Sequence, residues 1–92
     1  MNAELIYRTK ETHGQGLIEV VIWRVPHPVP PSEHLFKYRL VYIVDGKRVV
    51  GYDNERGKGD HKHLGEQEVA YTWVSPQQLM LDFMRDIDEV NT

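Results

Sequence analysis

The 92-residue sequence contains no cysteine, so it can form neither a disulfide bond nor a zinc site with thiolate ligands. It also lacks a long hydrophobic run, since no uninterrupted apolar stretch exceeds a few residues, whereas a transmembrane helix needs about 20. The first residues, "MNAELIYRTKE", do not contain the apolar core of a signal peptide. We therefore expect a cytoplasmic protein without a membrane-spanning segment.

The charge is unevenly distributed along the chain. The net charge of −3 argues against a general nucleic-acid binder. However, residues 1–63 contain ten Lys/Arg and eight Asp/Glu, a balance of +2, and residues 64–92 contain one and six, a balance of −5. Such asymmetry is typical either of a basic side that faces a polyanion or of an acidic C-terminal helix exposed to water.

Strands are predicted wherever polar and apolar residues alternate or β-branched and aromatic residues cluster. Asp45–Gly46 is typical of a two-residue hairpin turn, and Gly51 indicates a bulge or a close backbone approach. "PHPVPP" contains four prolines in six residues and predicts a rigid crossing loop. The predicted strands cover residues 3–9, 17–25, 36–44, 47–53 and 68–74.

A helix is predicted after Ser75, which suits an N-cap, with Pro76 at the first helical position and Gln78 completing a capping box. The expected apolar stripe contains Met80, Phe83, Met84, Ile87 and Val90. The residues expected to face water or a partner are Asp82, Asp86, Asp88 and Glu89. The sequence therefore predicts one α+β domain over residues 1–92, an antiparallel β-meander of four to five strands with one C-terminal helix packed on a face.

The segment from Asp53 to Glu66 is polar and contains three glycines, so we expect a long loop between the fourth and fifth strands. It contains His61 and His63, separated by Lys62. In an extended segment residues two apart point to the same side, so both imidazoles would meet the same substrate. Imidazole titrates near neutral pH, and two of them can serve as general base and general acid. A ribonuclease needs such a pair.

The neighbouring residues leave three interpretations open. Arg56, Lys58 and Lys62 could hold a phosphate, which supports an RNA site. The two histidines with Asp53 or Asp60 could instead bind a divalent metal. The segment could also be a solvated loop without a site. His34, which precedes a strand, is interpreted as a surface or capping residue.

The stretch "KYRLVYIVDGKRVVGYDNERGKGDHKHLG" resembles the TumE-type toxins of bacterial toxin–antitoxin pairs. The resemblance rests on a hairpin that ends in "YDN" (residues 52–54) and on the "DHKH" that follows (residues 60–63). It extends into the C-terminal helix and back to "VPHPVPP". It implies a small cytoplasmic protein that inhibits growth by attacking RNA or translation. It also implies a cognate antitoxin with a helix-turn-helix DNA-binding domain.

Taken together, these features predict a toxin that acts as a metal-independent endoribonuclease. His61 and His63 would be the acid–base pair, oriented by Asp53, and the predicted substrate-binding residues are Tyr52, Arg56, Lys58 and Lys62. No cofactor is needed for this chemistry. The alternatives are a non-catalytic module that binds a regulator or a phosphate, and a metal-dependent nuclease or hydrolase that uses His61, His63 and Asp53 with a divalent ion. Pairing of two exposed sheet edges would produce a homodimer.

Overall fold

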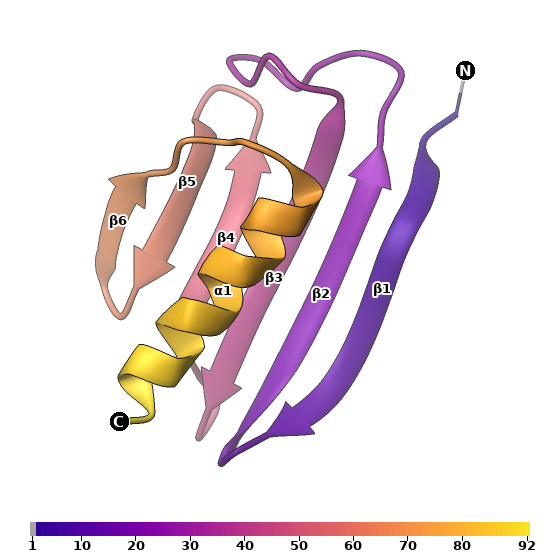
Figure 1. Cartoon of the computed structure of the whole chain (residues 1–92). Helices are drawn as coiled ribbons and strands as arrows, with labels where there is room; N and C mark the ends of the chain where they lie inside the picture. The colour runs from indigo at the N-terminus through magenta and orange to yellow at the C-terminus, as the bar shows by residue number, and fades with distance from the viewer. Residues whose placement is uncertain (1) are drawn as a thin grey trace.

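The computed structural model describes residues 2–92 and consists of one antiparallel sheet with a helix across one face (Figure 1). The six strands are adjacent in chain order and the helix follows them. This confirms the α+β fold, with six strands rather than four or five. The elements are β1 (Glu4–His13), β2 (Gly16–Arg24), β3 (Phe36–Val44), β4 (Lys47–Glu55), β5 (Gly59–Leu64), β6 (Gln67–Ala70) and α1 (Pro76–Val90).

The sixth strand comes from the segment that was predicted to be a long loop. Strand β4 continues to Glu55, a turn of three residues follows, and β5 begins at Gly59. Gly57 and Gly59 have φ values of +88° and +78°, a conformation that side chains with a Cβ rarely adopt. These two glycines therefore allow a tight hairpin where the polar composition predicted a loop. Strand β6 is shorter than predicted and ends at Ala70.

The hydrophobic core lies between the sheet and α1. Alternation along the strands places one set of side chains toward the helix, as the sequence pattern predicted. Burial of each large apolar side chain contributes about 1.5–3 kcal/mol to folding. The core residues are Ile18, Val20, Ile22, Tyr38, Leu40, Tyr42, Val50, Tyr52, Leu79, Phe83 and Ile87.

Helix α1 begins as predicted, because the Ser75 Oγ accepts a hydrogen bond from the Gln78 N–H at 3.0 Å. The prediction that Asp82 and Asp86 face water is wrong, since both are buried. Tyrosine hydroxyls of other segments reach these carboxylates: Tyr71 donates to Asp82, and Tyr52 donates to Asp86. No helix among residues 2–92 is long and apolar enough to cross a membrane.

One extra residue in β4 decides which side chains face away from the helix. Asp45 and Gly46 form the predicted two-residue turn, with φ values of +52° and +77°. Tyr42 pairs with Val50 while Ile43 pairs with Arg48, so Val49 is inserted between the two pairs. The insertion turns Gly51 and Asp53 toward the side of the sheet opposite α1, which we call the open face.

The proline-rich loop between β2 and β3 packs against the end of the β4–β5 hairpin. The Gly57 N–H donates to the Pro30 carbonyl at 2.8 Å, and a Cβ on Gly59 would lie 3.0 Å from the Pro31 side chain. The loop thus contacts this hairpin, while β1 and β6 form the two edges of the sheet.

Candidate active site

Three chemically active side chains meet on the open face of the sheet. Asp53 on β4 lies directly opposite His61 on β5, and His63 lies two residues further along the same strand. The potential ligand atoms of the three groups all lie within 4.8 Å of one another. The two imidazole rings are 4.9 Å apart between centroids and are inclined by 78°. Because β5 is extended, both rings occupy the same side.

His61 is buried, and both of its ring nitrogens face acceptors. Nδ1 donates to the Gly59 carbonyl at 2.9 Å. Nε2 lies 2.5 Å from Asp53 Oδ1 and 3.6 Å from Glu68 Oε1. The short contact to Asp53 does not have hydrogen-bond geometry, and Asp53 Oδ1 therefore has no hydrogen-bond partner. Nδ1 therefore carries a proton, whereas Nε2 faces two carboxylates without a hydrogen bond to either.

His63 lies beside a cation, which influences its pKa more than either nearby carboxylate does. Burial and the positive charge of Arg48 lower the pKa of His63 below its ordinary value of about 6.5. The Arg48 side chain lies over Gly51, where an added Cβ would stand 2.8 Å from Arg48 Cδ. The missing side chain at Gly51 thus makes room for a guanidinium beside His63. At pH 7 His63 is neutral and can accept a proton.

Arg39 brings a second cation to the cluster. It lies on β3, opposite Asp53, so that Arg39, Asp53 and His61 form one row across three strands. The sequence analysis did not select Arg39 or Arg48. The signal for Arg39 was its position in the alternation of β3, where it points away from the buried residues. To place Arg39 opposite Asp53 one must also know the register between β3 and β4, and this register depends on the inserted Val49.

The comparisons with known proteins give one match. A protein-family model described as "Toxin TumE" matches residues 2–91, nearly the whole chain. The chain belongs to the TumE toxin family. The resemblance in the sequence is thereby confirmed, and membership implies a toxin of a toxin–antitoxin system with an antitoxin as its partner. Neither the search of curated proteins nor that of solved structures gave a significant match.

Two predicted substrate-binding residues of this TumE-family chain lie on the other side of the sheet. Lys62 alternates with the two histidines and faces α1, where its Nζ donates to Asp86 at 3.2 Å. Tyr52 is buried beneath it, with the ammonium 5.6 Å from the centre of its ring. Neither side chain can contact a phosphate held by His61 and His63. Arg56 is exposed in the turn between β4 and β5. The Lys58 Nζ lies 3.7 Å from Glu68 Oε1.

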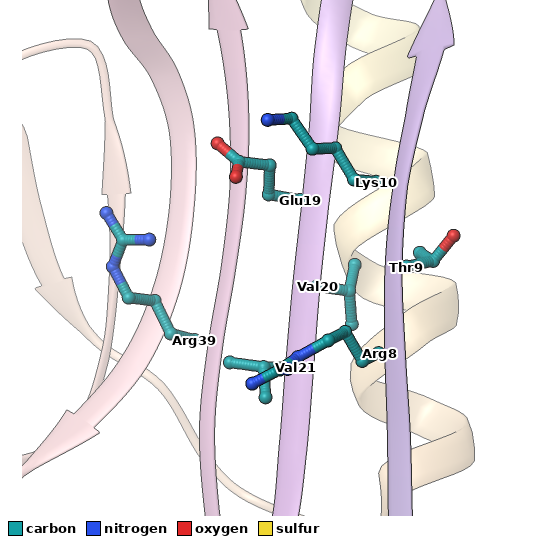
Figure 2. A pocket seen from close by; sticks show the side chains of 7 residues that line it. All are labelled: Arg8, Thr9, Lys10, Glu19, Val20, Val21 and Arg39. Atoms are coloured by element: carbon teal, nitrogen blue, oxygen red, sulfur yellow. The ribbon is translucent and has the colours of Figure 1, made fainter.

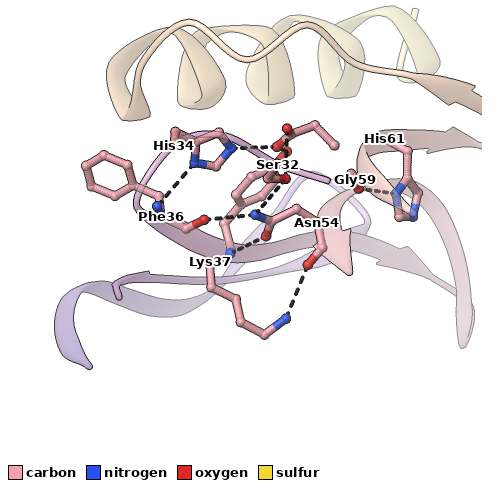
Figure 3. A network of polar contacts seen from close by, with 9 residues as sticks. Ser32, His34, Phe36, Lys37, Asn54, Gly59 and His61 are labelled. Atoms are coloured by element: carbon pink, nitrogen blue, oxygen red, sulfur yellow. Dashed lines mark hydrogen bonds and ion pairs between the residues drawn. The ribbon is translucent and has the colours of Figure 1, made fainter. Parts of the chain in front are cut away.

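Asp60, considered as a metal ligand with the histidines, also faces the helix side. It accepts hydrogen bonds from Ser32 at 3.0 Å and from Tyr38 at 2.7 Å, and it contacts His34 Nε2 at 2.8 Å. Figure 3 shows this network with His34 and His61 well apart. The Phe36 N–H donates to His34 Nδ1, so Nε2 carries the proton that His34 donates to Asp60. Asp60 therefore fixes the end of the proline-rich loop.

The donor set of the TumE-family cluster also suits a divalent metal. Two imidazoles and a carboxylate are common ligands of zinc, and the Nδ1–H bond from His61 to the Gly59 carbonyl would orient its Nε2. Two ligands about 2.1 Å from a tetrahedral ion stand about 3.4 Å apart. His61 Nε2 and Asp53 Oδ1 are 2.5 Å apart, which leaves no room for an ion between them without a side-chain rotation.

Proposed function

We propose that this TumE-family toxin is a metal-independent endoribonuclease whose active site is formed by His61, His63 and Asp53. The observation that supports this is the pairing of two adjacent imidazoles on the open face in contrasting surroundings, His61 beside two carboxylates and His63 beside the Arg48 guanidinium. Pairs of titratable groups in contrasting electrostatic environments are typical of acid–base catalysis. Cleavage of RNA at its own 2′-hydroxyl needs one such pair and no cofactor.

His63 serves as the general base because its lowered pKa keeps it neutral at pH 7. It accepts the proton of a ribose 2′-hydroxyl while the 2′-oxygen forms a bond to the adjacent phosphorus. The bond from phosphorus to the 5′-oxygen of the next nucleotide breaks, and His61 donates its Nε2 proton to that oxygen, since its Nδ1 is held by the Gly59 carbonyl. The products are a 2′,3′-cyclic phosphate and a 5′-hydroxyl end, and neither a metal nor a water molecule takes part.

The remaining groups position the acid and neutralise charge. Asp53 holds His61 through the 2.5 Å contact to Nε2 and is a positioning residue, since its partner is the ring and not the substrate. The guanidinium groups of Arg48 and Arg39 flank the cluster and would stabilise the negative charge that grows on the phosphate oxygens. They replace Lys62 in the role that the sequence analysis proposed.

A second candidate function is a metal-dependent nuclease or hydrolase with the same three residues as ligands. The proximity of the three ligand atoms and the unpartnered Asp53 Oδ1 favour it. The short contact between His61 and Asp53, and the cation of Arg48 beside His63, favour the metal-independent mechanism instead.

The antitoxin that family membership implies would be a helix-turn-helix protein that neutralises the toxin by blocking substrate entry. An acidic segment of the antitoxin would complement the basic residues near the cluster. We expect this complex to weaken as salt increases.

The test is cleavage of labelled single-stranded RNA by the purified chain, with and without EDTA. The wild-type chain is expected to cleave in both conditions. His63→Ala and His61→Ala are each expected to lower the rate by about 100-fold or more. His27→Ala, in an exposed loop, is the matched control and should cleave as wild type.

Three results would contradict this assignment. Cleavage that is lost with EDTA and restored by a divalent ion supports the metal-dependent candidate. Full activity in the double variant His61→Ala/His63→Ala removes the histidines from the mechanism. If correctly folded wild-type protein binds RNA or the antitoxin but cleaves no RNA, the chain is a non-catalytic binding module. Circular dichroism of each variant checks that the fold is retained.

A further inference from the structure

The strand register extends the active site into two continuous rows across the open face. In the first row, Arg8 on β1 is followed on successive strands by Val21, Arg39, Asp53 and His61. In the second row, the residues from β1 to β5 are Lys10, Glu19, Val41, Gly51 and His63. The two proposed catalytic histidines therefore lie in line with two basic residues on the far edge strand.

A shallow depression of about 220 Å³ occupies the β1 end of these rows. Figure 2 shows Arg8, Lys10 and Arg39 around it, on the side of the sheet opposite the helix. The floor between them is low, because Val21 is short and Val41 in the next row is buried. A ligand that lies along the first row from the depression toward Asp53 would pass the exposed Arg39 side chain.

The cations of the depression are not neutralised within the protein. Arg8, Lys10 and Arg39 are exposed, and across residues 2–92 none of them has a carboxylate within 4.0 Å. Glu19 stands opposite Lys10 and is the one acidic side chain that lines the depression within this described range. The Arg8 guanidinium lies 6.0 Å from the centre of the Trp23 ring, so a cation and an aromatic surface are presented together.

We propose that Arg8 and Lys10 form a phosphate-binding subsite for single-stranded RNA, with Arg39 between this subsite and the phosphate that is cleaved. This inference rests on the proposed ribonuclease function, because it takes His61 and His63, at the end of the two rows, to be the residues that cleave RNA. Neighbouring strands are about 4.8 Å apart, so Arg8 and His61 are separated by roughly 19 Å across the sheet. A polynucleotide that reaches both contacts the protein through several phosphates.

The features of the face fit a single strand better than a duplex. Basic grooves beside an aromatic ring are the common means of holding single-stranded nucleic acid, since the cations contact phosphates and the ring stacks on a base. The proposed cleavage also needs a flexible backbone, because the 2′-oxygen must align with the bond that breaks. The depression beside Trp23 combines cations with an aromatic ring, and a single strand has the flexible backbone that cleavage needs.

The test uses an RNA that can be bound but not cleaved, so that its outcome is independent of catalysis. The probe is a fluorescent single strand of about 12 nucleotides with 2′-O-methyl groups throughout. We expect Arg8→Gln/Lys10→Gln to raise the Kd about tenfold at low salt. The slope of log affinity against log salt should fall by roughly 0.7 for each phosphate that the variant no longer neutralises. Glu19→Gln should bind more tightly, because it removes the acidic side chain of the depression.

Arg24→Gln is the matched control. Arg24 is exposed on β2 but alternates with Trp23, so it points to the helix side. Equal weakening by Arg24→Gln and by the single variant Arg8→Gln would show that only net charge matters, and unchanged binding of the double variant would remove the subsite; either result overturns the inference. A labelled poly-glutamate peptide that binds through Arg8 and Lys10, with no binding of the RNA, would show instead that the face serves an acidic polypeptide. Intact probe binding with no cleavage of ordinary RNA would contradict the proposed function and leave the subsite supported.

Discussion

His61 Nε2 lies 2.5 Å from Asp53 Oδ1, and the two side chains come from directly opposed positions on β5 and β4. The ladder of hydrogen bonds between the two strands therefore sets their distance. The other nitrogen of the ring is held by the Gly59 carbonyl of the same strand. A buried imidazole that is hydrogen-bonded at Nδ1 and packed against a carboxylate at Nε2 has one orientation, which is what a catalytic acid requires.

Replacing Asp53 by Asn should test its positioning role. The amide is close in size to the carboxylate but cannot stabilise a protonated ring, so we expect kcat to fall by about 10- to 100-fold. KM should change little, because Asp53 contacts His61 and not the substrate. Steady-state cleavage of a short RNA measures both constants. A rise in KM with unchanged kcat would contradict the role.

Replacing Arg48 by Gln should move the pH dependence of cleavage. Burial and the guanidinium together lower the pKa of His63, so this base stays deprotonated at a lower pH than an ordinary histidine does. Without the charge the pKa of His63 rises, so the acidic limb of the pH–rate profile should shift to higher pH. Lys47→Gln, which removes a positive charge from an exposed position of the same strand, is a control for charge loss alone. A shift to lower pH would contradict the assignment of His63 as the base.

Replacing Asp86 by Ala should destabilise the fold. Its buried carboxylate accepts from the Tyr52 hydroxyl and from Lys62 at 3.2 Å, and burial together with this hydrogen bond raises the pKa of Tyr52 above its ordinary range. The variant leaves both partners unsatisfied, at an expected cost of about 1–3 kcal/mol. Urea unfolding measures the change. Asp88→Ala, an exposed position of the same helix, should cost much less, and equal losses would contradict the role of the network.

Asp82 should contribute to the sensitivity of the fold to acid. Burial raises its pKa, but the hydrogen bonds from Tyr71 and Gln78 and the charge of Arg85 outweigh burial, so the pKa of Asp82 is lowered overall. A lowered folded-state pKa gives stability that is present above the unfolded value of about 3.9 and is lost as pH falls through the folded value. Thermal unfolding between neutral pH and strong acid should therefore show a smaller loss for Asp82→Asn than for the wild type. An identical loss in both proteins would count against this contribution.

The sequence predicted the parts of the fold that local chemistry determines. The positive φ values at Asp45–Gly46 and the cap at Ser75 depend on neighbouring residues alone, and both are confirmed. Strand β5 was missed because its buried residues are Gly59 and His61 rather than apolar side chains. A strand without buried apolar side chains carries no hydrophobic alternation, and its pairing with β4 is what defines it.

The composition of the site was only partly predictable for a related reason. In any extended segment His61 and His63 point to the same side, and the structure confirms that these residues lie on a strand. Without the inserted Val49, Arg39 would face Tyr52 instead of Asp53, so the cations of the site depend on a single bulge. The burial of Asp82 and Asp86 depends on tyrosines from distant segments, which helical periodicity does not reveal.

The most direct test of the proposed mechanism is the chemical identity of the ends that cleavage produces, measured in EDTA by mass spectrometry. RNA cleaved by the wild-type chain should carry a 2′,3′-cyclic phosphate on one fragment and a 5′-hydroxyl on the other. A single 2′-deoxynucleotide at the cleaved position should block that cut. Fragments with a 5′-phosphate, or cleavage that continues at the 2′-deoxynucleotide, would contradict the account, because water and not the 2′-oxygen would then be the nucleophile.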